Sequence, residues 1–192
     1  MITARKLGKR FGDKRVLRGV DLEVARGAFA VVTGPNGSGK TTLLRVCAGL
    51  ALPTEGELVV DAPRARIGYL AHEPLVYREL SALENLDMYG RLYGVPERRE
   101  RIGMLLERFG LWEVRHERVA TFSRGMQQRL GLCRTLLHEP GVLILDEPAN
   151  ALDRDGLELL QAVLEDRRRA VAVATHDPAS VEGLATARLA FA

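Results

Sequence analysis

The chain has 192 residues, of which 46% are hydrophobic and 28% charged, and its formal net charge is +3. This length suits one sizeable core that carries a modest inserted subdomain. The apolar runs are far shorter than the roughly twenty residues of a membrane helix, and the N-terminus lacks the long apolar stretch of a signal peptide. We therefore expect a chain that does not cross a bilayer by itself and that has a cytosolic address.

Basic residues and cysteines give little sign of a special partner. Arg167–Arg169 form the one tight basic run, which is more typical of a solvated helix end than of a nucleic-acid surface, so we expect no nucleic-acid partner. Cys47 and Cys133 stand alone in predicted helices, far from any C-x-x-C spacing. We interpret both as small buried apolar residues.

The first part of the chain, residues 2–33, has the pattern of strands. Alternating apolar residues are followed by a turn at Arg26-Gly27 and then by the continuous apolar run at 28–32. A helix of about ten residues is expected after residue 40, and Gly49 and Pro53 would stop it.

A glycine-rich loop joins that apolar strand to the helix. Its eight residues, Gly34-Pro35-Asn36-Gly37-Ser38-Gly39-Lys40-Thr41, fit the pattern G-x-x-x-x-G-K-[ST]. Glycines let the backbone wrap an anion, so that N–H groups and the helix N-terminus face a phosphate. Lys40 would then reach the β- and γ-phosphates, and the Thr41 hydroxyl would bind Mg²⁺. A turn without a ligand is the alternative, and the flanking strand and helix argue against it.

The middle of the chain changes from strand to helix patterning. Short strands are expected at 57–61 and 67–70, and from about Pro74 to Leu137 apolar residues recur at helical spacing. Within this block Ser123 precedes a helical run that continues through Leu130. Ser123 is a good N-cap residue, and a more specific interpretation is that this helix N-terminus faces a phosphate bound by another copy of the chain.

Strand patterning returns after residue 140. Strands are expected at 142–145, 170–175 and near Leu189, with a helix from about Arg154 to Arg168 and a short helix before the last strand. Alternating strands and helices with apolar strands predict an α/β fold whose mostly parallel sheet is covered on both faces. The helical block interrupts this sheet as an insertion. We expect residues 1–72 and 140–192 to form a catalytic core and residues 73–139 a helical subdomain, within one domain of 192 residues.

Two carboxylates end the apolar strand at 142–145. Asp146 and Glu147 would lie where a parallel sheet opens its ligand crevice, Asp146 as the Mg²⁺ partner and Glu147 as the group that polarises an attacking water. A helix-starting Asp-Glu pair is the alternative, and the phosphate loop weighs against it. The next buried strand ends before His176, which either donates a hydrogen bond to the γ-phosphate or has no such task.

These motifs, in this order, resemble the nucleotide-binding subunit of ABC transporters over essentially all 192 residues. The matching segments are Gly34–Thr41 with the Walker A loop, Asp146-Glu147 with Walker B, Asn150–Asp153 with the D-loop, His176 with the switch histidine and Ser123-Arg124-Gly125 with the signature motif. The resemblance implies a P-loop NTPase of the ABC ATPase type with antiparallel N-terminal strands and an inserted helical subdomain. It also implies ATP hydrolysis, an ATP-driven homodimer, integral-membrane partner subunits and a peripheral place at the cytoplasmic face of the inner membrane.

The same resemblance implies a set of site residues, with ATP and Mg²⁺ as cofactors. Phe11 would stack on adenine, although a core phenylalanine would look the same in the sequence. The implied catalytic residues are Glu147, His176 and Lys40, and Mg²⁺ would be held by Thr41 and, through water, by Asp146. The implied ATP contacts are Phe11, Gly34, Pro35, Asn36, Gly37, Ser38, Gly39, Lys40, Thr41, Thr42 and His72; Ser123, Arg124 and Gly125 would contact the γ-phosphate of the partner site, and Asp153 belongs to the D-loop.

Three positions, in two motifs, depart from the family pattern. Arg124 and Met126 replace the first glycine and the glutamine of the signature, while Ser123 and Gly125 remain, so we expect the partner copy's γ-phosphate still to be recognised. His72 stands where the family usually has glutamine. A neutral imidazole can still hydrogen-bond a Mg²⁺-bound water, and imidazole ordinarily titrates near pH 6.5.

The segment that begins at His72 also bears on the substrate. Together with Pro74 and residues 79–86 it resembles the ATP-binding subunit of the haem exporters used in cytochrome c maturation, which implies haem export. The alternatives are a multidrug or ABC-2 type efflux system, a soluble ABC ATPase in DNA repair or translation, and a module that holds ATP without hydrolysing it. Residues 72–92 would carry motion to a membrane partner, with Tyr77, Leu80 and Leu83 as candidate contacts or as core residues.

Overall fold

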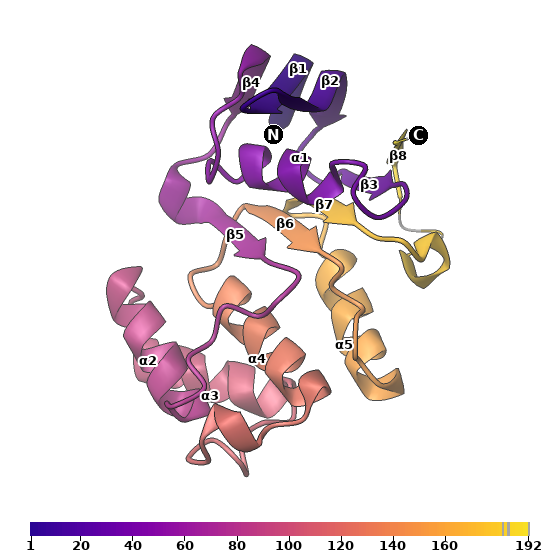
Figure 1. The fold of residues 1–192 in the computed structure, drawn as a ribbon. Helices are drawn as coiled ribbons and strands as arrows, with labels where there is room; N and C mark the ends of the chain where they lie inside the picture. The colour runs from indigo at the N-terminus through magenta and orange to yellow at the C-terminus, as the bar shows by residue number, and fades with distance from the viewer. Residues whose placement is uncertain (182, 184, 192) are drawn as a thin grey trace.

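The computed structural model describes residues 1–181, 183 and 185–191 of the chain, and Figure 1 shows their arrangement in stacked layers. The central layer is a five-stranded sheet in the order β5-β6-β7-β3-β8, in which all neighbouring strands are parallel. The strands of this sheet are β3 (Phe29–Thr33), β5 (Ile67–Leu70), β6 (Val142–Asp146), β7 (Ala170–Ala174) and β8 (Ala187–Ala190).

A second, antiparallel sheet lies at the N-terminal end of the molecule (Figure 1). Its order is β2-β1-β4, formed by β1 (Ile2–Phe11), β2 (Lys14–Val24) and β4 (Glu55–Val60). The tight turn between β1 and β2 pairs Phe11 with Lys14. This turn therefore places an aromatic ring and a cation side by side at one end of the sheet.

The two faces of the parallel sheet are buried in different cores because side chains alternate along each strand. Helix α1 (Lys40–Cys47) lies between the two sheets and packs on the face that includes Val32 and Ile144. Helix α5 (Arg154–Leu164) covers the opposite face, which includes Val31. This double cover explains why β6 and β7 are buried at every position.

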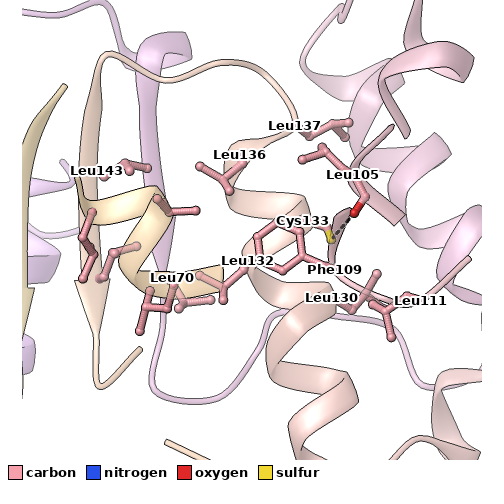
Figure 2. Packing of buried hydrophobic residues seen from close by; sticks show 14 of the residues in the cluster. Leu70, Leu105, Phe109, Leu111, Leu130, Leu132, Cys133, Leu136, Leu137 and Leu143 are labelled. Carbon is pink, nitrogen blue, oxygen red and sulfur yellow. Dashed lines mark hydrogen bonds between the residues drawn. The ribbon is translucent and has the colours of Figure 1, made fainter. Parts of the chain in front are cut away.

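Three helices stand between β5 and β6 in the chain, although these two strands are neighbours in the sheet. They are α2 (Ala82–Leu92), α3 (Arg98–Arg108) and α4 (Arg124–Leu136). Figure 2 shows α4 between the sheet and α3, with Leu132 and Leu136 packed among Phe109, Leu70 and Leu143. The helical subdomain proposed for residues 73–139 thus shares one continuous core with a face of the sheet.

Both cysteines behave as predicted. Cys47 and Cys133 are buried and free, and burial raises the pKa of both thiols, that of Cys47 to about 12. The Cys133 thiol lies 3.6 Å from the carbonyl oxygen of Leu105, to which it donates (Figure 2). Each residue thus fills space in a core as a small apolar group.

The predicted α/β class with a parallel sheet and antiparallel N-terminal strands is confirmed. The predicted extent of the helix at 154–168 is wrong, because α5 ends at Leu164. Beyond it, Asp166 accepts hydrogen bonds from the backbone and guanidinium of Arg168 and pairs with Arg169, which forms a turn instead of another helical turn. Among the described residues, no helix has the length and apolar character needed to span a membrane.

Candidate nucleotide-binding site

The phosphate loop wraps around the amino group of its own lysine. Gly34 has φ of +144°, and a Cβ atom there would lie 2.9 Å from the carbonyl oxygen of Phe191, so a side chain would not fit. Lys40 Nζ donates to the carbonyl oxygens of Gly34 at 2.7 Å and Pro35 at 3.1 Å. The Ser38 hydroxyl is buried without a partner in the described part of the chain. This loop thus presents a cation and donors to a bound anion.

Asp146 ends β6 directly beside the start of α1. Its side chain is only 1% exposed, and the Thr41 hydroxyl of α1 lies close to its carboxyl. Burial raises the pKa of this carboxyl, and the nearby Thr41 hydroxyl lowers it. Its Oδ2 atom is buried with no hydrogen-bond partner among the residues that the structure describes. Such an unpaired carboxylate oxygen beside a hydroxyl fits the all-oxygen coordination that Mg²⁺ prefers.

Glu147 follows Asp146 in a left-handed backbone conformation, with φ of +52°. Its N–H donates to the Ala174 carbonyl at the end of β7 at 2.8 Å, which fixes the residue against the neighbouring strand. His176, just beyond β7, lies with Nδ1 2.8 Å from Glu147 Oε2. Positive φ in a residue other than glycine is uncommon and is held by surrounding contacts, as is typical of functional sites.

A cavity of about 850 Å³ connects these groups. Phe11 lines this cavity and is 54% exposed, which excludes the alternative that it is a core residue. Lys9 Nζ lies 4.9 Å from the centre of the Phe11 ring. The lining residues are Phe11, Lys14, Arg15, Val16, Arg18, Asn36, Gly37, Ser38, Gly39, Lys40, Thr41, Thr42, His72, Asp146, Glu147, Asn150 and His176. The structure thus brings together the Walker A, Walker B and switch residues with Phe11 and His72.

Sequence reasoning missed the basic residues Lys14, Arg15 and Arg18, which line the same cavity. The signal that could have found Lys14 was the Gly12-Asp13 turn. A two-residue hairpin turn pairs the residues on either side of it, and so it puts Lys14 directly opposite Phe11. These cations add positive charge to the side of the cavity that faces the antiparallel sheet.

The signature residues Ser123 and Gly125 lie at the start of α4, away from the cavity at the phosphate loop of the same chain. Ser123 is the N-cap of α4 and accepts from Met126 N–H at 3.2 Å, and neither it nor Gly125 lines the cavity at the phosphate loop. A Cβ atom on Gly125 would lie 2.8 Å from the Ala151 carbonyl oxygen, so this glycine permits close approach of α4 to the D-loop. Asp153 of the D-loop caps α5, accepting from Gly156 N–H at 2.9 Å.

An ion pair joins the same two elements. Arg129 of α4 pairs with Asp153, and this hydrogen bond is the main reason that the pKa of Asp153 is lowered. A second cavity, of about 690 Å³, is lined by His72 and Asn150, which also line the first, and by Arg124 and Gln127 of α4. The start of α4, which carries the signature residues, therefore lines a separate cavity. This cavity meets the one at the phosphate loop at His72 and Asn150.

A phosphate loop between β3 and α1, with buried acidic residues at the end of β6 in the same parallel sheet, defines a P-loop nucleotide-binding protein. The sequence profile described as ABC transporter matches residues 17–150, and the chain belongs to this family. Residues 17–150 include the phosphate loop, both acidic residues and the signature helix.

Curated relatives support this membership. The chain is 40% identical to an uncharacterized ABC transporter ATP-binding protein, YxlF of Bacillus subtilis, over 92% of this chain and 62% of the relative. It is 43% identical to the daunorubicin resistance ATP-binding protein DrrA3 of Streptomyces coeruleorubidus, over 81% and 52% of the two chains. It is 37% identical to the cytochrome c biogenesis ATP-binding export protein CcmA of Cupriavidus necator, over 98% and 88%. The chain thus spans less than two thirds of the first two relatives.

A solved structure also supports membership of the ABC transporter family. The ATP-binding cassette MJ0796, seen as a dimer in a post-hydrolysis state bound to ADP and Pi, is similar with a TM-score of 0.88 at 27% identity, over 100% of this chain and 94% of that one. This similarity covers both the catalytic core and the helical subdomain.

Proposed function

We propose that this chain is the ATP-hydrolysing subunit of an ABC transporter. The observation that carries the proposal is the convergence of Lys40 and the pair Asp146-Glu147, from two segments far apart in the chain, on one cavity at the end of the parallel sheet. Hydrolysis of a phosphoanhydride needs positive charge at the phosphates and an oriented water, and these residue types supply both. A module that only holds ATP would not need the contact between His176 and Glu147.

The phosphate loop binds and orients the nucleotide. Lys40 donates to the β- and γ-phosphates in place of the two loop carbonyls that it now contacts, and Phe11 stacks on the base at the cavity edge. Thr41 and Asp146 would hold Mg²⁺, which neutralises phosphate charge when it is bound. His72 would hydrogen-bond a water at the same site from the start of the segment that leads into the helical subdomain.

Glu147 acts on the attacking water. Its carboxylate orients that water in line with the γ-phosphate, and His176 fixes the carboxylate by donating from Nδ1 to Oε2. Because Glu147 is buried at the end of β6, its backbone does not need to reorganise as charge develops.

A second copy of the chain completes the site. Ser123 and Gly125 of one copy would contact the γ-phosphate held by the other, consistent with their separation from the chain's own cavity. A relative of known structure, MJ0796, forms a dimer. We place the dimer at the cytoplasmic face of the membrane, against integral-membrane subunits and without a nucleic-acid partner. The exposed Tyr77 and the half-buried Leu80 and Leu83 are its candidate contacts with those subunits.

Two classes of cargo remain in our proposal. Haem export for cytochrome c maturation is supported by the segment at His72 and by the relative CcmA at 37% identity. Drug efflux is supported by the relative DrrA3 at 43% identity. A soluble ABC ATPase in DNA repair or translation has no comparable support here.

The test uses Glu147→Gln, which keeps the shape of the side chain and removes the base. We expect ATP turnover to fall by about 100-fold or more while ATP binding persists, so that a closed dimer accumulates in ATP and Mg²⁺ and is seen by light scattering. Normal turnover in this variant would exclude Glu147 as the base.

The same variant identifies the cargo class. A tagged Glu147→Gln chain, recovered from its native membranes in mild detergent with ATP and Mg²⁺, should retain its membrane partners for mass spectrometry. Recovery of cytochrome-maturation proteins would support haem export, whereas recovery of an unrelated permease would leave the ATPase proposal and remove the haem one.

A further inference from the structure

A buried amide of the helical subdomain reaches the backbone of the catalytic carboxylate. Gln128 lies in the second turn of α4 and is only 3% exposed. Its Nε2 donates to the carbonyl oxygen of Pro148 at 3.1 Å and lies 3.4 Å from that of Glu147. This is a specific polar contact, because loss of the donor would leave the buried Pro148 carbonyl without the hydrogen bond that it accepts from α4.

The backbone that Gln128 contacts is the one whose conformation aims the Glu147 side chain. Glu147 N–H is fixed to Ala174 on β7, and its carbonyl also accepts from Asn150 N–H at 3.1 Å within the following turn. These two bonds come from the catalytic core, whereas the bond from Gln128 comes from α4. The left-handed conformation of Glu147 is therefore supported from both parts of the molecule.

Other contacts make α4 a stiff connection to this segment. Arg129, the next residue, pairs with Asp153, and Gly125 allows the helix to approach Ala151 closely. The N-terminus of the same helix carries Ser123. A displacement of α4 relative to β6 would therefore be transmitted to Glu147 through the Gln128 amide.

We propose that Gln128 is a positioning residue for hydrolysis, which holds Glu147 in its working orientation only while α4 is seated against the β6–α5 segment. This inference rests on the proposed function of Glu147. In the dimer, the helix that presents Ser123 to the partner's nucleotide would thereby also set the base of its own site. Nucleotide binding itself does not involve Gln128, which does not line the cavity at the phosphate loop.

The first test is Gln128→Met, which keeps the length of the side chain and removes its donor. We expect kcat for ATP to fall about 10- to 100-fold, as for a catalytic group displaced by about an ångström, with KM for ATP within twofold of the unchanged protein. The matched control is Gln161→Met, an exposed glutamine on α5 whose amide donates to Glu165 at 2.9 Å and which lines neither cavity of the site. We expect its kcat to stay within twofold.

The second test places Gln128→Met in the Glu147→Gln background. If Gln128 acts through the base, the double variant should have the same residual turnover as Glu147→Gln alone and should form the ATP-bound dimer to the same extent. Loss of that dimer would show that Gln128 supports the signature surface instead, and an unchanged kcat in the single variant would also overturn the proposal.

Two further comparisons keep the outcome interpretable. Gln128→Glu keeps the shape and replaces the donor by an acceptor, so it should show the same loss of kcat if the methionine variant does not fold. If the unchanged protein does not hydrolyse ATP, or Glu147→Gln remains active, the proposed function fails. If both behave as expected and Gln128→Met and Gln128→Glu have normal kcat, only the present inference fails.

Discussion

The phosphate-loop end and the signature end of this molecule are built in opposite ways. At the first, Lys40, Asp146 and Glu147 are buried and held by contacts within the chain. At the second, Ser123 and Arg124 are exposed at the start of α4. Contacts within the chain fix Lys40 and the backbone of Glu147 before any ligand binds, so the first end is preorganised in one chain. The exposed end presents its donors to a group that another molecule must bring.

The largest expected effect tests whether the two ends work in different copies. Lys40→Met removes the phosphate-binding cation, and Ser123→Arg blocks the signature surface, so each homodimer should lose turnover by about 100-fold or more. Mixing the two variants should restore activity, up to about one quarter of normal, because random pairing makes half of the dimers mixed and each mixed dimer has one intact composite site. A mixture as inactive as its components would place both ends in the same site.

An effect of intermediate size tests why the signature has a glycine at position 125. The glycine either allows α4 to pack against Ala151 of the same chain or serves only the phosphate of the partner copy. A Cβ atom at Gly125 would lie 2.8 Å from the Ala151 carbonyl oxygen of the same chain, whereas one at Gly103 on α3 has its nearest contact at 3.7 Å. Gly125→Ala should therefore lower the free energy of unfolding of the ATP-free chain by about 1–3 kcal/mol. Gly103→Ala should be neutral or stabilising by up to about 1 kcal/mol.

Urea unfolding of both variants without nucleotide measures this difference. If Gly125 served only the partner's phosphate, both alanine variants would unfold alike.

The smallest expected effect concerns His138, far from both ends, where the sheet meets the helical subdomain. Burial lowers the pKa of His138, its contact with the Ile67 carbonyl raises it, and Arg134 and Arg66 lower it further; the ring stacks on Tyr93 at 4.3 Å. The folded chain thus favours neutral His138, and the unfolded chain binds the proton more readily. Stability is full above the unfolded pKa of about 6.5 and decreases as pH falls below it, by at most about 1.4 kcal/mol per pH unit for one proton.

His138→Gln should reduce this slope in urea titrations between pH 7 and pH 5. A slope equal to that of the unchanged protein would mean that His138 does not contribute to the pH dependence.

The sequence determined the parts of this protein that depend on local order. The loop at Gly34–Thr41 is recognisable because its glycines and lysine must stand at fixed spacings between a strand and a helix, and Asp146-Glu147 because they end an apolar strand. Periodicity likewise predicted the alternating strands and helices. It misjudged the end of α5, where the side chain of Asp166 forms a turn that competes with the helix.

The tertiary structure alone decided which distant groups meet. Periodicity could not show that Phe11 is exposed at the cavity or that Lys14 faces it, because both depend on how the N-terminal hairpin sits over α1. Nor could it show that Gln128 reaches the carbonyl of Pro148, twenty residues away, since a glutamine in a helix looks the same whether it faces solvent or a buried backbone. Local spacing specifies chemistry within a segment, whereas contacts between segments are set by how their apolar faces pack.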